Sequence, residues 1–159
     1  MKSPSAKLMS PPASALNQNL TAFAEDKFKY VGAKSLNATL AGAGKLGSAI
    51  LGYPGFKKYG FKVSCAFDAN KKKIGKKIHG LTVHSDSRIN SLEKRKIKLA
   101  IIATPSDVAQ NVTDKLVKAG VNGILNFAPC TLTAPKKVKI INIDIAIDLA
   151  TLPYYLSST

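Results

Sequence analysis

The sequence has few of the residues that mark membrane, disulfide-bonded or metal-binding proteins. Its 159 residues include no tryptophan and two cysteines, and no apolar run approaches the ~20 residues that a membrane helix needs. Cys65 and Cys130 are far apart and lie in apolar stretches, which predicts buried thiols in a reducing compartment and hence a cytoplasmic protein. His79 and His84 have no cysteine or carboxylate cluster beside them, so no metal site is expected.

Catalytic groupings are also missing. No Ser/His/Asp or Cys/His set points to nucleophilic catalysis, and no His or Tyr-x-x-x-Lys pair lies where a dehydrogenase needs an acid. We therefore expect a protein that is not an enzyme. A small oxidoreductase remains an alternative without support from the residues.

Acidic residues and arginine are scarce as well. Aspartate and glutamate together number 9 against 24 basic residues, which gives a formal net charge of +15, and Arg88 and Arg95 are the only arginines. A basic field attracts polyanions independently of base sequence, whereas base reading favours the arginine fork. A solvated, lysine-rich surface without a partner explains the composition equally well.

The chain divides into a polar arm, a regular middle part and an apolar end. Residues 1–35 are rich in Ser, Pro and Ala, which predicts a disordered arm with a short helical turn near residues 20–28 and leaves a targeting segment as an alternative. Strands are predicted at residues 38–41, 61–67, 81–83, 99–103, 123–127 and 138–141. Helices are predicted at residues 45–51, 85–96, 107–119 (capped by Ser106) and 143–156. This alternation over residues 36–142 predicts a Rossmann-like, doubly wound α/β fold with a mainly parallel sheet.

A glycine-rich loop carries the clearest chemistry. It follows the first strand, opens a helix, and comprises Gly42, Ala43, Gly44, Lys45, Leu46 and Gly47. Such a loop turns tightly, admits a pyrophosphate and lets the helix pack on the sheet. Asp68 follows about twenty residues later, where a carboxylate binds the adenosine ribose and disfavours a 2′-phosphate. The loop therefore predicts NAD(H), although Lys71, Lys72 and Lys73 are close enough in sequence to support NADP instead.

Two further candidate sites lie at the carboxyl ends of predicted strands. Thr104 and Pro105 follow one strand, and Asn126 and Phe127 lie at the end of the next. Ligands bind open α/β sheets at such strand ends. An ordinary turn between strand and helix is an equally good interpretation of each pair.

Three blocks in this order resemble the C-terminal domain of the Rex family of redox-sensing transcriptional repressors. They are AGAGKLGSAILGYPGFKKYGFKVSCAFDAN, LAIIATPSDVAQNVTDKLVKAGVNGILNFAP and INIDIAIDLATLPYYL. The resemblance covers residues 36–156. It implies a homodimer that senses the NADH/NAD⁺ ratio and leaves its operator DNA when NADH binds.

The resemblance also implies roles for single residues. The glycine loop would hold the pyrophosphate and Asp68 the adenosine ribose. Tyr53 and Asp144 would form the pair that responds to the redox state of the cofactor. The last helix, within residues 143–159, would be swapped onto the partner subunit. The nicotinamide side would be lined by Thr104, Pro105, Asn126 and Phe127.

The chain departs from the family pattern at two places. Rex proteins carry an N-terminal winged-helix domain, for which residues 1–35 are too few, so specific DNA binding by this chain alone is not expected. Pro153 lacks a backbone N–H and should kink or end the last helix. A stand-alone nucleotide-binding module of the CoA-binding type, without redox discrimination, is the main alternative function.

Overall fold

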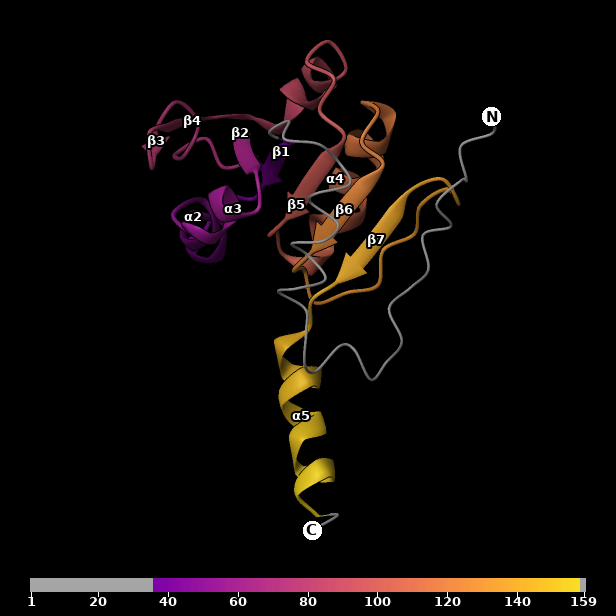
Figure 1. Ribbon diagram of the computed structural model, residues 1–159. Helices are drawn as coiled ribbons and strands as arrows, with labels where there is room; N and C mark the ends of the chain where they lie inside the picture. Colours follow the sequence, from indigo (N-terminus) through magenta and orange to yellow (C-terminus); the bar gives the residue numbers. More distant parts are fainter. Residues whose placement is uncertain (1–35, 158–159) are drawn as a thin grey trace, which may run out of the picture.

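The computed structural model describes residues 36–157, which form a seven-stranded sheet with helices and a projecting C-terminal helix (Figure 1). The strand order is β3-β4-β2-β1-β5-β6-β7. The strands are β1 (Leu36–Ala41), β2 (Phe61–Asp68), β3 (Lys77–Ile78), β4 (Leu81–Ser85), β5 (Leu99–Ile102), β6 (Gly123–Asn126) and β7 (Lys139–Asn142). The helices are α2 (Lys45–Leu51), α3 (Gly55–Lys58), the 3₁₀ helix η2 (Asp86–Leu92), α4 (Ser106–Lys118) and α5 (Ile145–Leu156).

All neighbouring strands are parallel except β3 and β4, which form an antiparallel hairpin at one edge. From β1 the chain moves outward to β2 and β4, then returns to β5 on the other side of β1 and continues to β6 and β7. The carboxyl ends of β1 and β5 therefore diverge into connections on opposite sides, which is the switch point of a doubly wound sheet. The predicted fold class is confirmed.

The two faces of the sheet are covered unequally. On one face, Phe67 and Ile102 pack with Leu92 of η2 and Leu116 of α4 in a continuous buried core. On the other face, a smaller cluster that includes Leu40 packs against α2 and α3. Over β5, β6 and β7 this second face bears an apolar groove of about 550 Å³.

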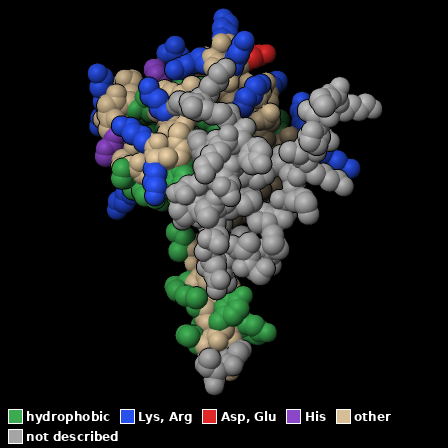
Figure 2. Space-filling view, in the orientation of Figure 1, with side chains coloured by type: hydrophobic (Ala, Val, Ile, Leu, Met, Phe, Trp, Pro, Cys, Tyr) green, Lys and Arg blue, Asp and Glu red, His purple; other side chains and the backbone are tan. Residues whose placement is uncertain are grey.

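Helix α5 leaves the body of the protein after β7 and projects away from it (Figure 1). None of its residues is buried, and its exposed side chains are mostly large and apolar (Figure 2). They include Ile145, Ile147, Leu149, Leu152, Tyr154, Tyr155 and Leu156. No helix in residues 36–157 is long and apolar enough to cross a membrane.

Several local predictions differ from the structure. The helix predicted at residues 85–96 is the shorter 3₁₀ helix η2. Pro105, not Ser106, is the N-cap of α4, because its extended backbone makes Ser106 the first helical residue. Val108, predicted on the buried face of that helix, is 40% exposed. Pro153 does not end α5, which runs three residues further. The arm predicted at residues 1–35 lies outside the described residues.

Candidate functional site

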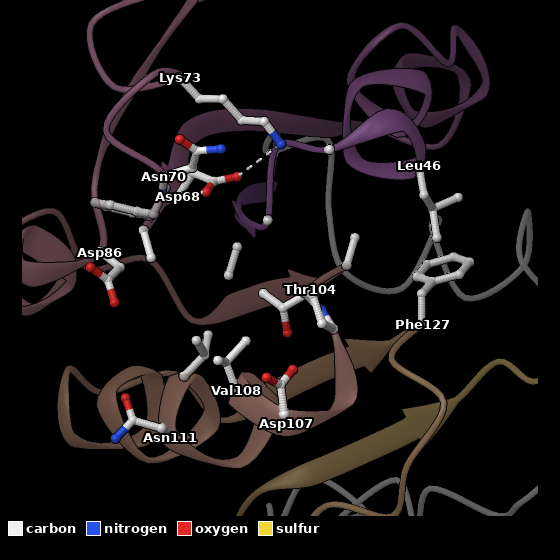
Figure 3. Close-up of a pocket in the computed structure, with 18 of the residues that line it drawn as sticks. Leu46, Asp68, Asn70, Lys73, Asp86, Thr104, Asp107, Val108, Asn111 and Phe127 are labelled. Carbon is white, nitrogen blue, oxygen red and sulfur yellow. Dashed lines mark hydrogen bonds and ion pairs between the residues drawn. The ribbon is translucent and has the colours of Figure 1, made fainter.

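A cleft of about 700 Å³ opens at the carboxyl ends of β1, β2, β5 and β6 (Figure 3). The glycine loop, the residues after β2, the first turns of α4 and the residues after β6 all contribute to its walls. Of the residues predicted from the sequence, those that line it are Gly42, Gly44, Lys45, Leu46, Asp68, Thr104, Pro105 and Phe127. The parallel topology thus brings four separate sequence segments to one site.

The glycine loop is shaped by close backbone approaches. A Cβ on Gly47 would lie 1.9 Å from the carbonyl oxygen of Gly42, and Gly42 itself has a φ of +99°. Gly44 differs, because the nearest atom to a Cβ there is the Nζ of Lys73 at 3.7 Å. Gly44 is the N-cap of α2 and has no side chain with which to cap this end. The first N–H groups of α2 therefore lack partners within the helix, an arrangement that suits an anion.

Asp68 connects the end of β2 to the glycine loop. Its Oδ2 accepts a hydrogen bond of 2.8 Å from the N–H of Ala43, and its Oδ1 accepts one of 2.8 Å from the N–H of Asn70. The Nζ of Lys73 lies 3.8 Å from Oδ2. Each carboxylate oxygen can accept a further bond. Ala43 does not line the cleft, and its N–H donates to Asp68.

The opposite wall of the cleft is more apolar. Leu46 and Phe127 point toward one another across one end of it (Figure 3). Between the two walls lies Thr104, whose Oγ1 is buried and has no hydrogen-bond partner within residues 36–157. An unpaired buried hydroxyl is costly, and a ligand that bonds to it removes that cost.

Asn126 is the one residue of the predicted nicotinamide side that does not line the cleft. It is fully buried. Its Nδ2 donates to the carbonyl oxygens of Ala128 and Cys130 and to Oδ1 of Asn142, at 2.9 to 3.2 Å. Its Oδ1 accepts from the N–H of Ala128. In the structure this side chain ties β7 and the segment after β6 together, which fixes the start of the loop that carries Phe127.

Tyr53 and Asp144 lie away from the cleft. Tyr53 lines the apolar groove over β5, β6 and β7 and packs edge-on against Phe56, with ring centroids 5.3 Å apart. Asp144 is the N-cap of α5 and accepts a hydrogen bond from the N–H of Ile147. Within residues 36–157 no hydrogen bond joins Tyr53 to Asp144. The structure therefore does not bring this predicted pair together inside one chain.

Some cleft residues were not among the predicted site residues. Asp107, Val108 and Asn111 of α4 line the wall that faces Asp68 and Asn70 (Figure 3). They were missed because a helix that follows a βα turn has no glycine or charge signature of its own. Lys73 was noted only as one of three consecutive lysines, and of these it alone lines the cleft.

Residues 33–130 match the CoA binding domain family. The redox-sensing transcriptional repressor Rex of Lactobacillus acidophilus is 42% identical over 123 residues, which cover 77% of this chain and 58% of that protein. Rex of Clostridioides difficile is 42% identical over 121 residues, which cover 76% and 58%. The chain thus spans 58% of the length of these two curated relatives.

The solved structures of RSP, a Rex-family repressor, are similar in fold. The structure of RSP has a TM-score of 0.76 and 34% identity, with 88% of this chain and 68% of that chain covered. RSP has also been solved in complex with β-NADH, and with β-NAD⁺ and operator DNA. The resemblance stated from the sequence is confirmed. The chain belongs to the family of the redox-sensing transcriptional repressor Rex and carries its Rossmann domain.

Proposed function

We propose that this chain binds NAD(H) in the cleft at the strand ends and, as part of a Rex-like transcriptional repressor, senses the NADH/NAD⁺ ratio. The observation that carries the proposal is the order of groups along one cleft. Asp68 stands at one end, the bare Cα of Gly44 and the uncapped start of α2 in the middle, and Thr104 with Leu46 and Phe127 at the other end.

The order of these groups along the cleft matches the order of the parts of a dinucleotide. Asp68 retains acceptor capacity for the adenosine ribose hydroxyls, and the loop at Gly44 leaves room for a pyrophosphate. The apolar wall of Leu46 and Phe127 suits a flat ring, and the hydroxyl of Thr104 can bond to a carboxamide or ribose oxygen. When bound, NAD(H) would supply the redox signal, and the residues of the cleft would hold and orient it.

The proposal includes a homodimer in which α5 of each subunit is swapped onto the other. The apolar groove over β5, β6 and β7 contains Tyr53, and Asp144 caps the start of α5. If the α5 of a second copy covers this groove, its Asp144 can reach Tyr53, which no contact achieves within one chain. This arrangement would make residues 36–142 the binding domain and residues 143–159 the dimerisation segment.

The proposed role is regulatory. The curated relatives are named as transcriptional repressors, and one solved structure shows RSP with operator DNA. For this chain we propose the sensing step, located in the cytoplasm where NADH and operator DNA meet, and no catalytic turnover. Multiple turnovers of hydride transfer to a carbonyl or hydroxyl substrate would contradict this part of the proposal.

A calorimetric titration tests the binding step. NADH, NAD⁺, NADPH and CoA are titrated in turn into the chain, and sedimentation is measured with and without NADH. We expect NADH to bind with micromolar or tighter affinity, with a clear preference over NAD⁺, to a dimer. Because residues 33–130 match a CoA binding domain, tighter binding of CoA than of NADH would select the alternative nucleotide-binding module. Equal affinities for NADH and NAD⁺ would contradict redox sensing.

A further inference from the structure

The side chain of Lys73 enters the cleft from the segment after β2. Its Nζ lies 3.8 Å from Oδ2 of Asp68 and 3.7 Å from the position that a Cβ on Gly44 would occupy. Figure 3 shows the side chain extending back over the cleft to Asp68. A positive charge thus stands between the carboxylate and the loop whose open backbone admits phosphates.

The backbone that carries Lys73 is held by a chain of turns. Oδ1 of Asp68 accepts from the N–H of Asn70, and Oδ1 of Asn70 accepts from the N–H of Lys72. The carbonyl of Asn70 then accepts from the N–H of Lys73 at 2.9 Å. Such Asx turns fix the direction of a short segment. As a result Lys73 faces the cleft, while Lys71 and Lys72 are exposed.

The pair of Lys73 and Asp68 is suited to rearrangement. At 3.8 Å the contact is long for a charge-assisted hydrogen bond, and the Lys73 side chain is 37% exposed. Asp68 keeps two backbone donors when the ammonium moves away. Lys73 can therefore exchange a weak ion pair for a closer contact to a phosphate without leaving the carboxylate unsatisfied.

We infer that Lys73 is a dinucleotide-binding residue that contacts the pyrophosphate beside Gly44. The inference rests on the proposed function for the identity of the ligand, but its chemistry is that of any adenosine diphosphate group. The pyrophosphate is favoured over a 2′-phosphate because the ammonium lies against Gly44, where the loop leaves space. A pyrophosphate contact is common to NADH and NAD⁺, so it adds affinity without redox preference.

The test compares Lys73→Met with Lys72→Met in the full chain, with NADH, NAD⁺, ADP, adenosine and NADPH as ligands. We expect Lys73→Met to lower the affinities for NADH, NAD⁺ and ADP to a similar extent, by about tenfold. The affinity for adenosine should change by no more than about twofold. Lys72→Met should match the unchanged chain, and Lys73→Arg should recover most of the affinity. The melting temperatures of the variants check that each is folded.

Three results would overturn the inference. An unchanged affinity of Lys73→Met for ADP would show that Lys73 does not contact the pyrophosphate. A loss of affinity confined to NADPH would show that Lys73 contacts a 2′-phosphate instead. An equal loss for adenosine would mean that Lys73 acts only through Asp68. If the unchanged chain binds ADP in a Lys73-dependent way but neither NADH nor NAD⁺, the proposed function fails and the inference about Lys73 stands.

Discussion

The three glycines of the loop at residues 42–47 differ in backbone conformation and in surrounding space, although they belong to one motif. Gly42 has a left-handed backbone and lies under the carbonyl of Ala103, 2.5 Å from the position of an added Cβ. Gly47 has even less room against the carbonyl of Gly42. Gly44 has a φ of −76°, which any residue adopts, and open space beyond it. Gly42 and Gly47 are therefore required by the fold, whereas no backbone contact within residues 36–157 requires glycine at position 44.

Gly44→Ala and Gly47→Ala should separate stability from binding. Gly47→Ala forces backbone apart and should lower the free energy of unfolding by more than ~2 kcal/mol. Gly44→Ala should lower the free energy of unfolding by less than ~1 kcal/mol, mainly through the N-cap. It should nevertheless lower the affinity for NADH by at least about tenfold, because the new methyl group takes the space of the pyrophosphate. Urea unfolding and calorimetry measure the two effects. Unimpaired NADH binding by Gly44→Ala would place the pyrophosphate elsewhere.

Residues with a fixed spacing could be predicted from the sequence, and residues placed by tertiary contacts could not. Asp68 reaches the glycine loop because β2 pairs beside β1, a relation that the spacing of the motif already implies. Asn126 was predicted on the nicotinamide side from its place at a strand end, but its buried contacts were not, because its partner Asn142 becomes a neighbour only when β6 pairs with β7. Lys73 is indistinguishable from Lys72 in the sequence, and only the Asx turns separate them.

At the scale of elements, α5 and η2 show where local pattern and structure diverge. Pro153 removes the hydrogen bond to the carbonyl of Leu149, but Leu149 is exposed, so water can bond to that carbonyl and the helix continues. In η2 the side chain of Ser85 accepts from the N–H of Ser87, and Ser91 donates to the carbonyl of Arg88. Such bonds compete with a regular α-helix, and the predicted twelve-residue helix shortens accordingly.

Helix α5 should determine the oligomeric state. Its residues are apolar or aromatic except Asp148 and Thr151, and none is buried. An isolated helix of 12 residues is marginal in water. Leu149→Asp places a charge in the surface that must be covered and should convert a dimer into monomers, with the Rossmann core still folded. Leu149→Met, which keeps volume and polarity, should remain dimeric. Analytical ultracentrifugation distinguishes the two, and a dimeric Leu149→Asp variant would exclude α5 from the interface.

At the scale of the whole molecule, the alternation of strands and helices was enough to predict the doubly wound fold. The strand β3 was not predicted from the sequence, because its two residues, Lys77 and Ile78, are too few to show a periodic pattern. The apolar groove over β5, β6 and β7 could not be predicted either, because its apolar residues resemble those of any buried strand. A local pattern records only that these residues are apolar, and not what packs against them.

The net charge is the remaining whole-molecule property, and it predicts a measurable behaviour. The chain carries +15, and the ion pairs within residues 36–157 join only Lys73 to Asp68 and Lys115 to Asp86. Figure 2 shows lysine and arginine side chains spread over the body of the protein with few acidic neighbours. Most of this charge is therefore free to attract a polyanion by releasing its counterions.

We expect the chain to bind two unrelated DNA duplexes with equal affinity at low salt. If about four phosphates are contacted, the affinity should fall roughly 100-fold between 50 and 200 mM salt. Because this binding needs only lysine charge, NADH should leave it unchanged, and replacing Lys71, Lys72, Lys76 and Lys77 by glutamine should flatten the salt dependence. Fluorescence anisotropy at several salt concentrations measures all three effects. A preference for one duplex at every salt concentration would indicate base reading, and no binding at low salt would mean that the lysines form only a solvated surface.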